Sequence, residues 1–136
     1  MALSSSLKSK AFMVEKTVTL GVASGTTVGP LVGANTTVIA AGIEFITAAG
    51  SAETSATVAI GDGVTANLAA VDMQAQAAGK ILGGVVPSFV STNDTVDAVL
   101  DVTGAGLVAA TVRIWYVGVD CNENTKPAAE VARDLA

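Results

Sequence analysis

Residues 107–120 read LVAATVRIWYVGVD and contain the chain's one Trp and its one Tyr. Side chains alternate in character along this stretch, and because successive strand residues point to opposite faces of a sheet, the alternation predicts a β-strand. The even-numbered face is wholly apolar and comprises Val108, Ala110, Val112, Ile114 and Tyr116. The odd-numbered face is mixed, since the Arg113 side chain favours contact with water whereas Trp115 and Val117 favour burial. A strand with this apolar face is expected at the centre of a sheet.

The rest of the chain is built from short strands of small residues. Of its 136 residues, 51% are apolar but only 4% are aromatic, and Val, Thr and 14 glycines recur throughout. Alternating or apolar segments predict strands at residues 12–20, 28–32, 35–48, 55–60, 80–86, 89–90 and 95–102, joined by Gly/Asn/Ser turns. This pattern predicts an all-β fold, a jelly-roll-like β-sandwich of six to eight short strands with one short helix.

Four local expectations follow from the same reading. In the strand at 35–48 the odd-numbered residues are expected to point inward. Residues 67–78 lose the period of two and predict one or two helical turns that end at Gly79. Residues 104–106 predict a hairpin between the strand at 95–102 and the strand at 107–120. Asp97 and Asp101 fall on one face of their strand, about 13 Å apart, and are interpreted as solvated.

The two ends of the chain differ from its middle. Residues 1–11 are rich in Ser and Lys, lack periodicity and predict a flexible arm. Residues 127–136 predict a short helix, too short to be stable unless it lies on a surface. The expected organisation is therefore an N-terminal arm at 1–11, a β-sandwich domain at 12–120 and a C-terminal tail at 121–136.

Catalytic and metal-binding patterns are missing from the sequence. The chain has no His, which removes the commonest general base, the commonest metal ligand and the Ser-His and Cys-His pairs. Its single Cys excludes an intrachain disulfide and a zinc site made of thiolates alone. A calcium-loop spacing opens at Asp120 but departs from the required pattern at Thr125 and Val131. We therefore expect no enzyme activity, no cofactor and no bound metal.

Charge and hydropathy limit the classes of partner. The net charge of −5 and the absence of a basic stripe argue against nucleic acid. Residues 17–43 carry no charge, but Pro30, five glycines and several Thr interrupt them, so we expect no membrane span.

The order of segments resembles the small virion structural proteins of tailed bacteriophages, of the head-decoration or capsid-cement kind. The resemblance covers about residues 16–119 and is carried by KTVTL at Lys16, EFITA at Glu44, IGDG at Ile60, NLAAVDMQ at Asn67, NDTVDAVL at Asn93 and ATVRIWYV at Ala110. It implies a jelly-roll or β-sandwich protein, trimeric, that binds the major capsid protein on the outer surface of the phage head. Such a protein is made in the bacterial host cytoplasm and resides in the virion. The tail after Asp120 departs from the pattern.

An assembly protein works through its interfaces, and Trp is enriched in interface hot spots. The candidate interface residues are Phe12, Arg113, Trp115, Val117, Val131 and Leu135. Two interpretations of Trp115 remain open, an interface anchor and a core or edge-sealing residue. An alternative function also remains open, a receptor- or glycan-binding head or tail-fibre module, which requires Trp115 or Tyr116 to be exposed.

Overall fold

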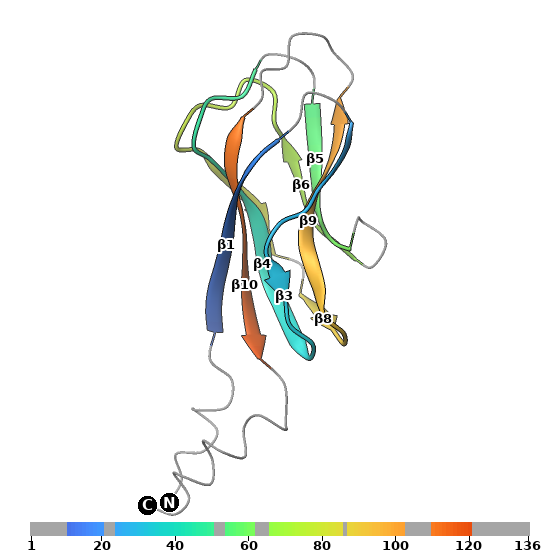
Figure 1. Cartoon of the computed structure of the whole chain (residues 1–136). Coiled ribbons are helices and arrows are strands. Elements are labelled where there is room, and N and C mark those ends of the chain that lie inside the picture. Colours follow the sequence, from blue (N-terminus) through green and yellow to red (C-terminus); the bar gives the residue numbers. More distant parts are fainter. Residues whose placement is uncertain are drawn as a thin grey trace, which may run out of the picture.

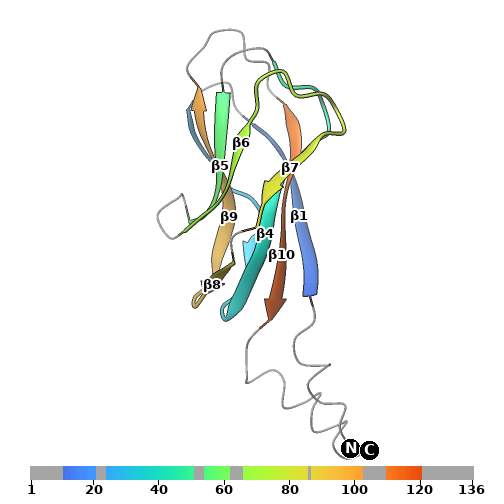
Figure 2. The ribbon, with the colours of Figure 1, turned by 180° about the vertical axis from the view of Figure 1, so that it is seen from behind.

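The computed structural model describes residues 11–20, 24–50, 54–61, 66–85, 87–102 and 110–120, which form antiparallel strands in two facing sheets (Figures 1 and 2). One sheet, here the β10 sheet, has the order β1-β10-β4-β7, with β8 also paired to β4. The other, the β9 sheet, has the order β2-β9-β5-β6, with β3 also paired to β9. The strands are β1 (Ala11–Thr19), β2 (Gly25–Thr27), β3 (Leu31–Val32), β4 (Thr36–Phe45), β5 (Thr54–Ile60), β6 (Ala66–Asp72), β7 (Ile81–Gly84), β8 (Ser88–Val90), β9 (Asp94–Val102) and β10 (Thr111–Asp120).

The pairing of the strands is nested along the chain. The first strand pairs with the last, β2 and β3 pair with β9, β4 pairs with β7 and β8, and β5 pairs with β6. β2 and β3 share one position in their sheet, as do β7 and β8, so the described strands occupy eight positions. Two four-position sheets with this nested order are the architecture of a jelly roll, which confirms the predicted fold class.

β10 lies at the centre of its sheet, as the alternation of its side chains predicted. It pairs with β1 on one side and with β4 on the other. Its even-numbered residues Val112, Ile114 and Tyr116 are buried, whereas the odd-numbered ones are partly exposed. The Tyr116 hydroxyl crosses the sandwich and donates a hydrogen bond to the Leu31 carbonyl oxygen at 2.8 Å. β10 therefore supplies both the middle of one sheet and a polar link to the other.

A β-bulge changes which residues of β4 point inward. Val117 pairs with Ala40 and Gly118 with Val38, which leaves Ile39 as the extra residue. Because an inserted residue reverses the alternation, even-numbered residues are buried before the bulge and odd-numbered ones after it. The prediction that odd-numbered residues point inward along the whole strand is therefore right only beyond Ile39.

The predicted helix at residues 67–78 is wrong. Residues 66–72 form strand β6, which pairs with β5. A second bulge makes Leu68 the extra residue, because Val58 pairs with Ala69 and Ala59 with Asn67. Leu68 and Val71 are both buried as a result. Their spacing of three residues imitates a helical period, although its cause is an insertion in a strand.

The predicted hairpin at residues 104–106 is also corrected. Residues 103–109 lie outside the described part of the chain, but the strands on either side of them belong to different sheets. A hairpin joins neighbouring strands of one sheet, whereas this connection passes from the β9 sheet to the β10 sheet.

Asp97 is buried, contrary to its interpretation as solvated, whereas Asp101 is exposed. The connection between β2 and β3 passes close to Asp97, and the backbone N–H of Gly29 donates a hydrogen bond to its carboxylate at 3.1 Å. Gly29 is required there because a Cβ would collide with the carbonyl oxygen of Val96. The Asp97 carboxylate thus holds this connection against β9.

Residues 1–10 and 121–136 lie outside the described part of the chain. The arm and the tail therefore stay predictions, except that Ala11, which was assigned to the arm, belongs to strand β1.

Candidate interaction surface

The outward side chains of the β10 sheet form a surface that we call the outer face. The strand register arranges them in rows across β1, β10, β4 and the β7/β8 position. The rows are Thr17–Arg113–Glu44–Ile81, Glu15–Trp115–Gly42–Gly83, Met13–Val117–Ala40, and Ala11–Val119–Thr37–Phe89. The first row carries charges, the second holds Trp115 and the last two are mainly apolar.

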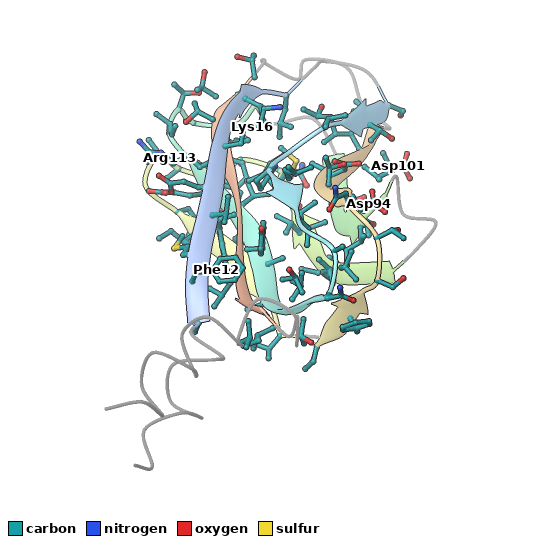
Figure 3. All side chains as sticks on the ribbon, turned by 60° about the horizontal axis from the view of Figure 1, so that its bottom comes forward. Phe12, Lys16, Asp94, Asp101 and Arg113 are labelled. Atoms are coloured by element: carbon teal, nitrogen blue, oxygen red, sulfur yellow. The ribbon has the colours of Figure 1, made fainter. Side chains whose placement is uncertain are left out.

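Arg113 forms ion pairs with acidic side chains on both neighbouring strands. Its Nη1 lies 3.3 Å from Oε2 of Glu44 on β4, and its Nε lies 3.8 Å from Oε1 of Glu15 on β1. All three side chains remain partly exposed to solvent, so the pairs are screened and orient the groups more than they stabilise the fold. We call these three residues the charged cluster; Figure 3 labels Arg113 beside β1.

Trp115 lies over glycines of the two neighbouring strands. A Cβ built on Gly42 or on Gly83 would come within 2.7 or 2.8 Å of the Trp115 Cζ2 atom, closer than such atoms approach. The glycines therefore provide the space in which the indole ring rests across β4 and β7. Among the described residues, none accepts a hydrogen bond from the buried indole N–H. Packing, rather than hydrogen bonding within this part of the chain, holds the ring.

Beyond Trp115 the outer face becomes apolar. We define the apolar end by the residues Met13, Ala40, Phe89, Val117 and Val119. Met13 is 59% exposed and Phe89 is 55% exposed, and the other three are partly exposed. Isolated apolar residues on a surface are common, but a group contributed by four neighbouring strands is a feature of interaction sites.

The outward surface of the β9 sheet is different. Its rows include Leu31–Thr95, Thr26–Val99–Thr57–Ala70 and Asp101–Ser55–Asp72. The Asp101–Ser55–Asp72 row is polar and exposed throughout, and the other two rows each contain one apolar residue larger than Ala, of which Leu31 is 63% exposed. Apart from Leu31 this surface suits contact with water, whereas the outer face of the β10 sheet suits contact with another surface.

The β1 edge of the β10 sheet is less suited to a partner than the outer face. Lys16 sits on the inward side of the edge strand β1, and its Nζ donates a hydrogen bond to the Val28 carbonyl oxygen at 3.3 Å. An inward-pointing charge on an edge strand opposes the addition of a further strand. Addition of a strand at the β1 edge is therefore disfavoured.

The candidate interface residues are distributed over two places. Arg113, Trp115 and Val117 lie together on the outer face. Phe12 instead packs on the inner side, with its ring perpendicular to that of Tyr116 at a centroid distance of 6.2 Å. Val131 and Leu135 lie outside the described residues.

Sequence reasoning missed Met13, Ala40, Phe89 and Val119. Met13 and Val119 could have been found, because each belongs to the odd-numbered face of an alternating strand. The other two required the strand order and the bulge at Ile39, which only the structure gives.

Among the described residues, no three acidic or cysteine side chains gather in a way that would hold a metal ion. That part of the chain also contains no helix with the length and apolar character that crossing a bilayer requires.

Comparison with known proteins supports the fold. No family model and no curated protein matches the chain. A solved structure, described as the acidic stable capsid structure of Helicobacter pylori bacteriophage KHP30, contains a chain with a similar fold, at a TM-score of 0.57 and 16% sequence identity. The alignment covers 82% of this chain and 90% of the KHP30 chain. The chain thus shares its fold, over most of its length, with a component of a phage capsid structure.

Proposed function

We propose that this protein is a structural protein of a tailed-bacteriophage virion, of the head-decoration or cement type. It binds the major capsid protein on the outer surface of the head and stabilises the shell without catalysis. Its own copies associate, with a trimer as the favoured state. The proposal rests on the resemblance in the order of segments, and the jelly roll shared with a chain of the KHP30 capsid structure supports it.

The observation that carries the proposal is the difference between the two outward surfaces. A protein that coats a shell meets protein on one side and solvent on the other. The outer face of the β10 sheet joins an aromatic anchor, an apolar end and a charged cluster, which are the components of a protein interface. The outward surface of the β9 sheet is polar and exposed along its Asp101–Ser55–Asp72 row, which suits a solvent-facing side.

The test is addition of the purified chain to phage heads that lack their decoration protein. We expect attachment that saturates and raises the temperature at which the heads disrupt. Light scattering on the free protein measures whether three copies associate. Absence of attachment at high protein concentration, with the chain shown to be folded by circular dichroism, would contradict the proposal.

A further inference from the structure

We infer that the apolar end of the outer face is the docking site for residues 127–136 of the same chain, held there as a short helix. This inference goes beyond the proposed function, because it concerns the free protein and states what covers the apolar residues before any partner arrives.

The sequence of residues 127–136 fits a helix with one apolar side. Ala128, Val131, Ala132 and Leu135 follow the spacing i, i+3, i+4 and i+7, which places them on a single stripe. Glu130, Arg133 and Asp134 fall on the remaining surface, and Pro127 suits the first helical position. A helix of ten residues is marginal in water, so it requires an apolar surface to pack on.

The place where the described chain ends brings this segment to the apolar end. β10 ends at Asp120, directly after Val119, which belongs to the apolar end. The six residues 121–126 then span at most about 20 Å, and connections of two to six residues commonly join a strand to a helix that packs on its sheet. Residues 127–136 can therefore return over the outer face of the strand that they follow.

The dimensions of the two surfaces also agree. Ten helical residues extend about 15 Å. From Val119 to Trp115 the outer face runs about 13 Å along β10, and from β1 to β8 it spans three strand spacings, about 14 Å. Of the charged cluster, Arg113 and Glu44 lie on the far side of Trp115, and Glu15 lies beside Trp115 on the edge strand β1. The Val131 and Leu135 side chains can therefore pack on the two apolar rows while the charged side of the helix faces solvent.

The same chain, rather than a neighbouring copy, is the expected source of the helix. A short linker holds a segment near its site at an effective concentration of about a millimolar, which exceeds the concentration of free neighbours in dilute solution. The N-terminal residues leave β1 beside Val119 at the same end of the sheet, but Lys8 and Lys10 adjoin the strand and the remaining residues carry no apolar stripe comparable to that of the tail.

Trp115 provides a direct test, because it is the only tryptophan and borders the apolar end. The double variant Val131→Asp/Leu135→Asp should shift its fluorescence emission to the red and increase quenching by acrylamide, whereas Glu130→Gln, on the opposite side of the helix, should change neither. Trypsin should cleave after Arg133 slowly in the wild type and faster in the double variant. Unchanged emission and unchanged cleavage in the double variant would overturn the inference.

Two further measurements identify the occupant. Wild-type emission that is constant on dilution supports docking within one chain, and a red shift on dilution would assign the helix to a neighbouring copy and overturn the inference. Deletion of residues 2–10 should leave the emission unchanged, since a red shift would assign the site to the N-terminal segment instead. All of these measurements use the free protein, so a failure of the chain to attach to phage heads does not affect their outcome.

Discussion

The two sheets of this jelly roll share one core but differ in what their central strands present outward. β10 presents Arg113, Trp115 and Val117, whereas β9 presents Val99 and the exposed Asp101. On their inner sides β9 buries small and medium apolar residues, whereas β10 buries Val112, Ile114 and the larger Tyr116. Burial of the inner sides stabilises the sandwich, so the outward sides are free to differ. We therefore propose that the difference marks the surface that meets a partner.

The largest loss of stability is expected at Gly42, where the outward side of the β10 sheet has no room for a side chain. In Gly42→Val the new side chain would collide with the Leu82 carbonyl oxygen and displace the Trp115 ring. We expect a loss of about 3 kcal/mol or more in the free energy of unfolding, measured by urea denaturation.

The matched control is Thr57→Val, which places the same side chain on the outward side of a central strand of the β9 sheet. We expect a change within about 0.5 kcal/mol. If the two variants lost equal stability, the space that Gly42 and Gly83 leave for the Trp115 ring would have no special role.

The comparison of binding surfaces is tested by one substitution made on each central strand. Val117 and Val99 are both partly exposed and point outward from β10 and β9. Val117→Asp should weaken attachment to phage heads by about 2 kcal/mol, roughly thirtyfold, because it places a charge in the middle of the proposed interface. Val99→Asp should leave attachment close to that of the wild type. Equal losses in a binding titration would show that the outer face of the β10 sheet is not the contact surface.

Asp97 is the buried acidic residue of strand β9, and its substitution tests whether its carboxylate stabilises the fold. Asp97→Ala removes the acceptor of the buried Gly29 N–H, and we expect it to lower the free energy of unfolding by about 2 kcal/mol. Asp101→Ala, four residues along the same strand, changes an exposed side chain and should stay within about 0.5 kcal/mol. Denaturation curves measured side by side compare the two, and an equal cost would contradict the role assigned to the Asp97 carboxylate.

The Tyr116 hydroxyl links the two sheets, and its ionisation should make the free energy of unfolding depend on pH in alkaline solution. Burial raises the pKa of Tyr116 above its ordinary value of 10.0. Below pH 10 the hydroxyl is protonated in both the folded and the unfolded chain, so this group adds no pH dependence there. Above that pH the unfolded chain ionises first, and stability falls by up to about 1.4 kcal/mol per pH unit until the raised pKa is passed.

Tyr116→Phe isolates this contribution, because the chain has no other tyrosine. We expect the variant to be about 1 kcal/mol less stable near neutral pH, from loss of the hydrogen bond to Leu31, but to lose less stability between neutral and alkaline pH than the wild type. Urea denaturation at a series of pH values measures both effects, and identical alkaline losses would show that the hydroxyl ionises equally in the two states.

The sequence predicted the fold where alternation is uninterrupted and failed where a strand contains an extra residue. β10 was recognised because its described residues alternate without a break on the inner side. The inward side of β4 was only half right and β6 was mistaken for a helix, since the bulges at Ile39 and Leu68 are set by the pairing partners. The burial of Asp97 was not predicted for a similar reason, because the segment at Gly29 that packs against it is distant in the sequence.

The candidate surface was predictable only along a single strand. Arg113, Trp115 and Val117 are neighbours in the alternating pattern, so one strand was enough to bring them together. The apolar end required four strands in register, and the space for the Trp115 ring required Gly42 and Gly83 to align across two of them. Sequence spacing carries no information on such alignment between distant segments.

The smallest effect is expected from the charged cluster of the β10 sheet. Arg113→Gln removes both ion pairs but keeps a long polar side chain, and because Arg113, Glu15 and Glu44 are partly exposed, the stability change should be at most about 0.5 kcal/mol. Added salt should reduce the difference between variant and wild type, since it screens charges at the surface. If the cluster guides binding, the variant should attach to heads more slowly at low salt while its dissociation rate changes little. A large, salt-independent loss of stability would instead place Arg113 among the residues that hold the sandwich together, and the distinction between inner and outward sides would not hold at this position.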